Sequence, residues 1–262
     1  MADSPAERNR PEATPGRRPG DRAPAGYEAS DYPAFAVTVD IVIMTLIDDA
    51  VSVLLVRRGG DPFAGMWALP GGFKHPDETL DAAAARELSE ETGVLPPSRL
   101  EQFRAYGDPD RDPRLNVVTV AYLAVVNRVG SLTAGTDADG AALHRLNAVL
   151  SGDLQLAFDH RRIITDAAGH VAERLETSDL ATAFVPETFT LSQLRCVYEQ
   201  FWNERLDAAN FRRSLTGDSL SYVQATEERT APSSRGGRPA ELFTATDLWR
   251  HAAPPIRRRR RG

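Results

Sequence analysis

Apolar and β-branched residues gather in the first half of the chain in the way that predicts a sheet. Phe35–Leu46 (FAVTVDIVIMTL) and Val51–Val56 (VSVLLV) are predicted to be neighbouring strands, and Asp48-Asp49 between them is typical of a tight turn. These two strands indicate a sheet-based domain in the first half of the chain. Three further apolar runs predict the remaining strands: Leu100–Tyr106, Val117–Val126 and Ala141–Leu150.

The second half of the chain changes to helical spacing. In Phe158–Leu175, apolar residues recur three or four positions apart, which predicts a helix that ends the first domain or links it to the next. Thr190 is a candidate N-cap for a helix over Leu191–Trp202, and Asp207 is the expected cap of a second, shorter helix over Ala208–Leu215.

A pair of strands follows these helices. They are predicted over Tyr222–Thr226 and Leu242–Ala245, and the segment between them contains the basic sequence SSRGGRP at residues 233–239. Helix, turn, basic short helix and then a hairpin with a basic loop is the order of a winged helix-turn-helix. The alternative is a small α+β extension that only packs against the first domain.

Composition narrows the class of protein. A length of 262 residues is enough for two modest domains, and 42% hydrophobic with 26% charged residues is ordinary for a soluble globular protein. The single cysteine, Cys196, excludes a disulfide framework and a cysteine-based metal site, and it fits a reducing cytoplasm. No apolar run approaches a membrane span, so we expect no membrane partner.

Charge is distributed unevenly along the chain. Residues 1–30 carry five acidic and five basic residues with almost nothing to bury, and we predict that they are disordered. Residues 31–177 hold 22 acidic against 13 basic residues, whereas residues 178–262 hold 10 against 13, with five of these in Arg257–Arg261. A basic end behind an acidic middle is compatible with nucleic-acid binding.

The most specific chemical signal is the sequence GFKHPDETLDAAAARELSEETGV at residues 72–94. Its alanine-rich middle favours a helix, and the glycine near its end is typical of a helix stop. On that helix Glu87, Glu90 and Glu91 are three and four residues apart, so their carboxylates share one face. Crowded carboxylates raise one another's pKa unless a cation neutralises them, and dense oxygen ligands suit Mg²⁺ or Mn²⁺. The alternative is an ordinary solvated acidic helix face.

This stretch resembles, at every fixed position, the Nudix box of hydrolases that cleave nucleoside diphosphates linked to another moiety. The resemblance implies an α/β/α sandwich and a catalytic centre in which Glu87, Glu90 and Glu91 hold Mg²⁺ or Mn²⁺. It also implies that the Gly72 carbonyl joins these metal ligands, that Glu87 activates water and that the water attacks a phosphorus. We expect Arg86, on the neighbouring face of the helix, to anchor one of the carboxylates.

Arginines outside the box are the candidates for substrate contacts. Arg57, with its neighbour Arg58, follows a predicted strand and can reach a phosphate; a solvated strand end is the alternative. Arg111 and Arg114 lie in the turn-rich segment GDPDRDPR, and their forked guanidinium groups suit a pyrophosphate. A surface turn closed by its own salt bridges is the alternative there. We expect His160 to belong to helix packing and assign it no metal.

Segments beyond the box resemble NrtR-type regulators of NAD metabolism. The resemblance implies an ADP-ribose-sensing Nudix domain fused to a DNA-binding winged helix. Many members of this family have a damaged Nudix box, whereas the box of this chain is complete, which favours retained hydrolysis. The similar segments are, in chain order, Gly107–Arg114 with Val117–Leu123, Leu156–His160, Phe184–Leu194, Asn210–Arg213 and Gly237–Ala240.

The resulting hypothesis is an α+β protein, a Nudix α/β/α sandwich followed by a winged helix-turn-helix, that regulates transcription in response to ADP-ribose or a related nucleotide. Its predicted parts are residues 1–30 (tail), 31–157 (Nudix domain), 158–177 (linking helix), 178–250 (winged helix-turn-helix) and 251–262 (basic tail). We expect a homodimer on double-stranded operator DNA. The competing hypothesis is a housekeeping hydrolase of the ADP-ribose pyrophosphatase type whose C-terminal domain serves oligomerisation. The predicted DNA-contacting residues are Asn210, Arg212, Arg213, Arg235 and Arg238.

Overall fold

The computed structural model describes residues 28–31, 33–94, 100–129, 138–217, 221–230 and 239–258. The chain divides into two compact units, Met1–Ala34 and Phe35–Gly262. The described part of the first unit holds one short 3₁₀ helix, η1 (Ala29–Asp31). The predicted disorder of residues 1–30 therefore falls almost entirely outside the described residues. Within the described ranges, no helix is long and apolar enough to cross a membrane.

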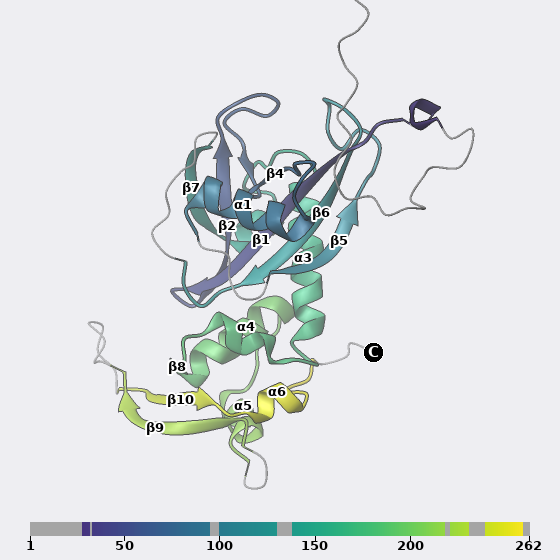
Figure 1. The fold of residues 1–262 in the computed structure, drawn as a ribbon. Helices are drawn as coiled ribbons and strands as arrows, with labels where there is room; N and C mark the ends of the chain where they lie inside the picture. The colour runs from purple at the N-terminus through teal and green to yellow at the C-terminus, as the bar shows by residue number, and fades with distance from the viewer. Residues whose placement is uncertain are drawn as a thin grey trace, which may run out of the picture. The chain divides into compact units, whose positions relative to one another are not determined.

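A seven-stranded mixed sheet, counted over the described residues, is the centre of the first half of the chain (Figure 1). Its strands β1 and β6 run parallel, and all its other pairs are antiparallel. In addition, β4 (Gly71–Phe73) pairs with β1, and β7 (Ala138–Arg145) pairs with β2. The main strand order is β3 (Trp67–Ala68), β2 (Ala50–Arg58), β1 (Ala36–Ile47), β6 (Val117–Val125) and β5 (Glu101–Tyr106).

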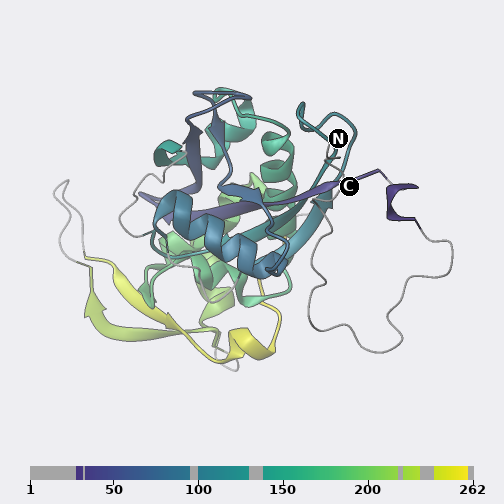
Figure 2. The ribbon, with the colours of Figure 1, turned by 45° about the horizontal axis from the view of Figure 1, so that its top comes forward.

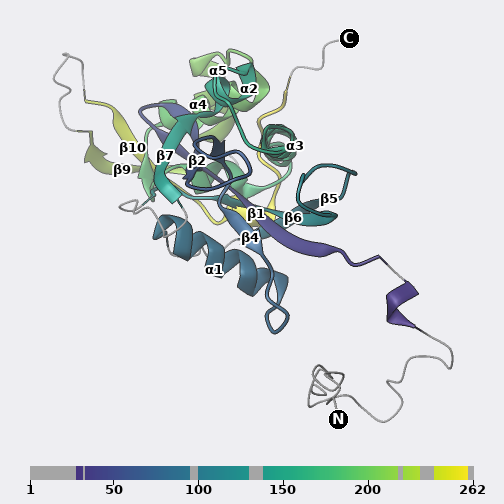
Figure 3. The same ribbon diagram turned by 90° about the horizontal axis from the view of Figure 1, so that it is seen from above.

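Successive side chains of β1 enter two different cores because neighbouring residues of a strand point to opposite faces. Ile43 belongs to the cluster beneath α1 (Leu80–Thr92), and Met44 belongs to the cluster beneath α3 (His160–Arg174). Both side chains are fully buried, and burial of a side chain of this size contributes about 1.5–3 kcal/mol. Helix α1 lies across one side of the sheet (Figure 2), and α3 lies on the other (Figure 3). The predicted α/β/α sandwich is confirmed.

The prediction of a strand over Ala141–Leu150 is wrong in its second half. Strand β7 ends at Arg145, and the chain continues as a short helix, α2 (Leu146–Ser151). Leu146 and Val149, three positions apart, then share the core beneath α3. An apolar run of this length is equally compatible with a strand and a buried helix, so periodicity alone does not separate them.

The described residues of the last third of the chain form a helix-turn-helix and a three-stranded antiparallel sheet in the order β8-β10-β9. Both predicted helices begin at their predicted caps. The Thr190 hydroxyl and the Gln193 side chain form a capping box, and the Asp207 carboxylate accepts a hydrogen bond from the Asn210 amide at 2.8 Å. The segment 231–238 between the last two strands lies outside the described residues. The elements are η2 (Asp179–Phe184), β8 (Thr188–Phe189), α4 (Leu191–Trp202), α5 (Ala208–Leu215), β9 (Val223–Arg229), β10 (Glu241–Ala245) and α6 (Leu248–His251).

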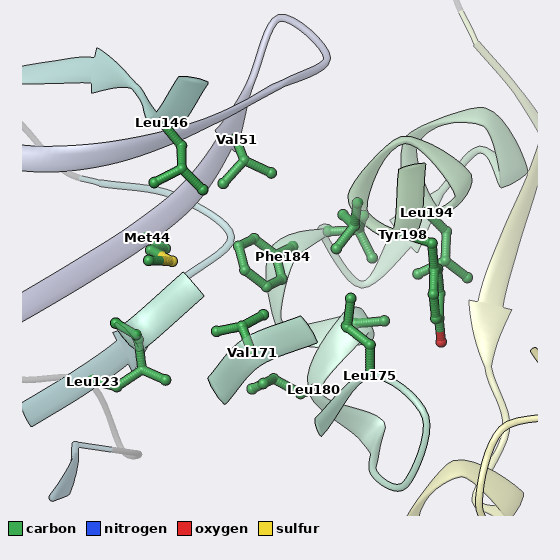
Figure 4. Close-up of a cluster of buried hydrophobic side chains, with 14 of the residues drawn as sticks. Met44, Val51, Leu123, Leu146, Val171, Leu175, Leu180, Phe184, Leu194 and Tyr198 are labelled. Carbon is green, nitrogen blue, oxygen red and sulfur yellow. The ribbon is translucent and has the colours of Figure 1, made fainter. Parts of the chain in front are cut away.

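One apolar cluster joins the sheet, α3 and the helix-turn-helix (Figure 4). Phe184 lies at its centre, between Met44 of the sheet and Tyr198 of α4, and all three side chains are buried. The Trp202 indole of α4 also donates a hydrogen bond of 3.0 Å to the Ala172 carbonyl of α3. The sheet, α3 and α4 therefore share one apolar core.

Candidate functional site

Helix α1 positions the three glutamates of the acidic face. Its start is fixed by Thr79, whose hydroxyl accepts a hydrogen bond of 3.1 Å from the Ala82 amide. Its end is fixed by Gly93, which adopts a left-handed conformation with φ of 69° that costs glycine little. The helix between these caps turns its acidic face toward a single cavity. The glutamates that line this cavity are Glu87, Glu90 and Glu91.

Arg86 connects the loop before α1 to the acidic face. Its guanidinium binds both carboxylate oxygens of Glu78, at 2.7 and 3.1 Å. The same group donates to Glu87 at 2.8 Å and to Glu90 at 3.0 Å. Hydrogen bonds from Arg86 and from the His75 amide lower the pKa of Glu78 to about 2. The structure therefore places Arg86 as the common partner of three acidic side chains.

Two of the three glutamates are shielded from water. Burial raises the pKa of Glu91 to about 7, although the hydrogen bond of 2.9 Å from the Gly71 amide acts in the opposite direction. Burial also raises the pKa of Glu87, against the effect of its ion pair with Arg86. An ordinary solvated helix face would expose these residues, whereas Glu87 is only 9% exposed. A nearby cation would stabilise both negative charges.

The acidic face offers the oxygen donors that divalent cations prefer, but Arg86 holds two of its carboxylates and they are not gathered around one point. A Cβ atom at Gly72 would lie 2.3 Å from Glu87 Oε1, so a larger residue there would displace this carboxylate from its position. Among the described residues, no three His, Cys, Asp or Glu side chains are gathered closely enough to hold a metal ion. Arg86 supplies the positive charge between Glu87 and Glu90 in this arrangement. A divalent cation fits the same carboxylate chemistry, since such ions prefer oxygen ligands.

Arginines line the cavity together with these glutamates. The Arg111 side chain is 5% exposed and binds both oxygens of Asp159, at 2.6 and 3.1 Å. Burial by itself would lower the pKa of Arg111, but this ion pair and the nearby Asp40 outweigh it and raise the pKa. Arg114 binds both oxygens of Asp112, at 2.7 and 3.0 Å, as a salt-bridged turn would. Each guanidinium therefore already has a carboxylate partner.

Two further arginines reach the cavity from the end of β2. The Arg57 side chain donates to the Gly65 carbonyl at 3.1 Å, and the Arg58 side chain donates to the Pro62 carbonyl at 2.8 Å. Burial lowers the pKa of Arg58. The structure thus brings all three sequence-predicted arginines around the same cavity as the glutamates. The cavity-lining arginines are Arg57, Arg58, Arg86, Arg111 and Arg114.

Sequence reasoning gave no role in the site to Asp40, Phe158 or His160, although all of them line the cavity. His160 is 4% exposed; its Nδ1 accepts a hydrogen bond of 2.8 Å from the Leu69 amide, and its Nε2 lies 3.4 Å from Asp40. Burial lowers the pKa of His160, which favours the neutral imidazole. Our expectation that His160 serves only helix packing was therefore incomplete. The sequence signal for Asp40 was its own charge, since it interrupts the apolar run of β1.

The cavity has the dimensions and charge pattern of a nucleotide site. Its volume is about 830 Å³, within the range of roughly 300–1,000 Å³ that is usual for small-molecule pockets. Carboxylates from α1 and arginines from β2 and the β5–β6 loop line the same space. An anion such as a diphosphate suits the arginines, and a metal ion bound to the carboxylates would bind the same anion.

The surface of α5 is separate from this cavity. Asn210, Arg212 and Arg213 are all exposed on it, as a DNA-contacting helix requires. Arg213 donates a hydrogen bond of 2.8 Å to the Asn210 side chain. Arg212 instead pairs with Glu241 of β10 at 2.8 Å, so it also connects the helix to the small sheet. The predicted contacts Arg235 and Arg238 lie outside the described residues.

The fold and the cavity define a two-part class of protein, a Nudix domain joined to a winged helix. The family model of the NUDIX domain matches residues 35–167, and that of the NrtR DNA-binding winged helix domain matches residues 181–245. Over 221 residues the chain is 33% identical to the ADPR responsive transcriptional repressor NtrR of Acinetobacter baylyi, covering 84% of this chain and 85% of that protein. The chain therefore belongs to the NrtR family of Nudix proteins.

Two further similarities concern the separate parts of this architecture. The chain is 40% identical over 131 residues to the ADP-ribose pyrophosphatase of Methanocaldococcus jannaschii, covering 50% of this chain and 72% of that protein. The crystal structure of Shewanella oneidensis NrtR complexed with a 27mer DNA superposes with a TM-score of 0.66 at 30% identity, covering 83% of this chain and 96% of that one. The similarity to that DNA-bound structure extends over both parts of the chain.

Proposed function

We propose that this protein is a cytoplasmic transcriptional repressor that responds to ADP-ribose and also hydrolyses it. The observation that carries the proposal is the cavity in which Glu87, Glu90 and Glu91 share the lining with Arg57, Arg111 and Arg114, in the same compact unit as an exposed helix-turn-helix. The family membership supports the regulatory role. The complete acidic motif, together with the similarity to an ADP-ribose pyrophosphatase, supports hydrolysis.

In this proposal the arginines bind the diphosphate of ADP-ribose, and the glutamates serve the metal. Arg57, Arg111 and Arg114 neutralise the phosphate oxygens by forked hydrogen bonds. Glu87, Glu90 and Glu91, with the Gly72 carbonyl, would hold Mg²⁺ or Mn²⁺, which when bound neutralises developing phosphate charge and orients the attacking water. Arg86 connects the acidic face of α1 to the loop before the helix through its hydrogen bonds with Glu78, Glu87 and Glu90.

The hydrolytic step consumes one water molecule. The water oxygen forms a bond to phosphorus, the bridging phosphorus–oxygen bond breaks, and AMP and ribose 5-phosphate are released. Glu87 is the proposed acceptor of the proton that the water loses. Burial raises the pKa of this carboxyl, which makes it a better proton acceptor than an exposed glutamate.

DNA binding is assigned to α5 and the segment between β9 and β10. Asn210, Arg212 and Arg213 would contact DNA from the second helix of the helix-turn-helix, and Arg235 and Arg238 from the wing. Helix-turn-helix proteins commonly bind two half-sites as dimers, so the proposed active form is a homodimer. The alternative function, a housekeeping hydrolase with an oligomerising C-terminal domain, is favoured only by the complete acidic motif.

A DNA-binding experiment separates these two functions. Purified full-length protein is titrated against DNA fragments from upstream of its own gene and neighbouring genes, with random-sequence DNA of equal length as the matched control. The proposal predicts that at least one fragment is retained by the protein well before the random DNA. Equal retention of every fragment and of random DNA would instead support the housekeeping hydrolase.

A further inference from the structure

We propose that three consecutive residues, Phe158, Asp159 and His160, report occupancy of the nucleotide cavity to the DNA-binding part. These residues, named here the reporter segment, lead into the first turn of α3. The inference rests on the proposed function, because it concerns how that cavity regulates DNA binding. Each of the three residues contacts a different charged group of the cavity. The other end of α3 contacts α4 of the helix-turn-helix.

Asp159 is the partner of Arg111. Its two carboxylate oxygens accept hydrogen bonds of 2.6 and 3.1 Å from the guanidinium, whose side chain is almost completely buried. Arg111 comes from the loop between β5 and β6, so this ion pair ties the wall of the cavity to the start of α3. A bound phosphate would present the same pattern of oxygens to Arg111 as Asp159 does.

Phe158 lies among the other arginines. The guanidinium carbon of Arg58 is 5.0 Å from the centre of its ring, and that of Arg114 is 5.8 Å away. Its φ of 52° is in the left-handed region that bulky side chains rarely adopt, and it turns the chain sharply into α3. Any movement of these two arginines toward an anion changes the packing around Phe158.

His160 completes the connection on the floor of the cavity. Its Nδ1 accepts from the Leu69 amide at 2.8 Å, and its Nε2 lies 3.4 Å from Asp40. The same Asp40 lies 3.4 Å from Arg111. Asp40, Arg111 and His160 are buried and Asp159 is partly buried, and together they form one network in which a change at any member alters the contacts of the others.

The far end of α3 contacts the DNA-binding part. Ala172 accepts the hydrogen bond of the Trp202 indole, and Val171 and Leu175 belong to the same apolar cluster as Tyr198 of α4. A continuous α-helix of 15 residues extends over about 22 Å at a rise of 1.5 Å per residue, and it moves as a rigid element. A shift at the reporter segment therefore reaches α4 without further intermediates.

The proposed signal is an exchange of partners at the arginines. When a nucleoside diphosphate binds, its phosphate oxygens compete with Asp159 for Arg111 and draw Arg58 and Arg114 away from Phe158. The reporter segment then takes up a second arrangement, and α3 moves with it. Since the ligand contacts the two arrangements unequally, it shifts the equilibrium between them, which regulation of DNA affinity requires.

The test uses Asp159→Asn with Asp166→Asn as its matched control. Asp166 lies in α3 and accepts hydrogen bonds from Arg104 at 3.0 Å and from the Tyr106 hydroxyl at 2.9 Å. Its partner Arg104, unlike Arg111, does not line the nucleotide cavity. Dissociation constants for the upstream DNA fragment are measured with and without saturating ADP-ribose, in EDTA so that the nucleotide is not consumed. ADP-ribose binding to each variant is measured separately by calorimetry.

The wild type and Asp166→Asn are expected to show the same change in DNA affinity, about 5–150-fold. For Asp159→Asn the ratio of DNA affinities should fall toward one, while ADP-ribose binds at least as tightly because Arg111 has lost a competitor. An Asp159→Asn variant that binds ADP-ribose and keeps the full wild-type ratio would overturn the inference. If ADP-ribose does not change the DNA affinity of the wild type, the proposed function itself is contradicted.

Hydrogen–deuterium exchange on the wild-type protein provides a second readout that does not depend on the variant folding. The amides of Arg162 and Ile163 bond to the Asp159 carbonyl, so their exchange reports directly on the start of α3. ADP-ribose should change exchange several-fold in peptides that cover residues 158–166. Unchanged exchange there, together with a clear response in peptides covering the acidic face, would also refute the reporter segment.

Discussion

The three glutamates of the acidic face, Glu87, Glu90 and Glu91, have different surroundings although their side chains are chemically identical. Glu90 is 59% exposed at its side chain and is paired with Arg86. Glu91 is shielded, with a pKa of about 7 and a hydrogen bond from the Gly71 amide. Glu87 is closest to full burial, accepts a hydrogen bond from Arg86, and lies beside Gly72 where a Cβ atom would otherwise stand. Their loss should therefore affect the protein differently, although all three would serve one metal.

The first prediction at this scale concerns hydrolysis. In the presence of Mg²⁺ or Mn²⁺, Glu90→Gln should release AMP from ADP-ribose about tenfold to a hundredfold more slowly than the wild type. The reason is that the metal loses one oxygen ligand. Thermal stability should change little because Glu90 is exposed. The measurement is AMP release by chromatography, with the exposed Glu228→Gln as control and EDTA as the metal-free reference. Unreduced turnover in Glu90→Gln would exclude this residue from the metal site.

At the residue scale, sequence predicted what depends on local spacing. The common face of Glu87, Glu90 and Glu91 follows from helical geometry alone. The ion pair between Arg111 and Asp159 does not, because its partners are 48 positions apart and meet only when α3 packs against the sheet. The position of His160 beside the cavity was missed for the same reason.

Among the elements, those with caps or strong periodicity were predictable. Helices α4 and α5 begin where Thr190 and Asp207 predicted, since both caps are formed within three residues of chain. Strand β8 has only two residues and is defined by its pairing with β10, so nothing local distinguishes it. The short helix α2 was taken for a strand because its apolar residues satisfy either pattern.

The prediction at the element scale concerns α5. Arg213→Ala should weaken binding to specific DNA and reduce the slope of log affinity against log salt by about one unit, because one phosphate contact is lost. Arg213 is exposed, and its one hydrogen bond given by the structure is to Asn210, so the fold should be retained. Affinities are measured by fluorescence anisotropy at several salt concentrations. Arg128→Ala, which removes the same charge from an exposed site on the Nudix part, serves as the control.

A slope and affinity of Arg213→Ala indistinguishable from those of the wild type would show that this arginine faces away from the DNA. A loss of equal size in Arg128→Ala would show that only net charge matters. Arg212 is less suited to this test, because its ion pair with Glu241 gives it a second role within the small sheet.

At the scale of the whole molecule, the central feature is a shared core. The apolar cluster that includes Met44, Phe184 and Tyr198 contains residues of the sheet, η2 and α4. The two parts therefore bury apolar side chains against each other, which a loosely attached extension would not do. The overall order of a sandwich followed by a winged helix was predictable from sequence. The shared core was not, because it depends on contacts between residues more than a hundred positions apart.

The most direct test of the account is the coupling between nucleotide and DNA in Glu90→Gln, which should bind ADP-ribose and consume it far more slowly than the wild type. Operator affinity is measured by anisotropy at a series of ADP-ribose concentrations, and ADP-ribose affinity is measured with and without operator. We predict that saturating ADP-ribose weakens operator binding by about 5–150-fold, and that operator weakens ADP-ribose binding by the same factor, as thermodynamic linkage requires. An operator affinity that stays constant well beyond saturation of the nucleotide site would contradict the account.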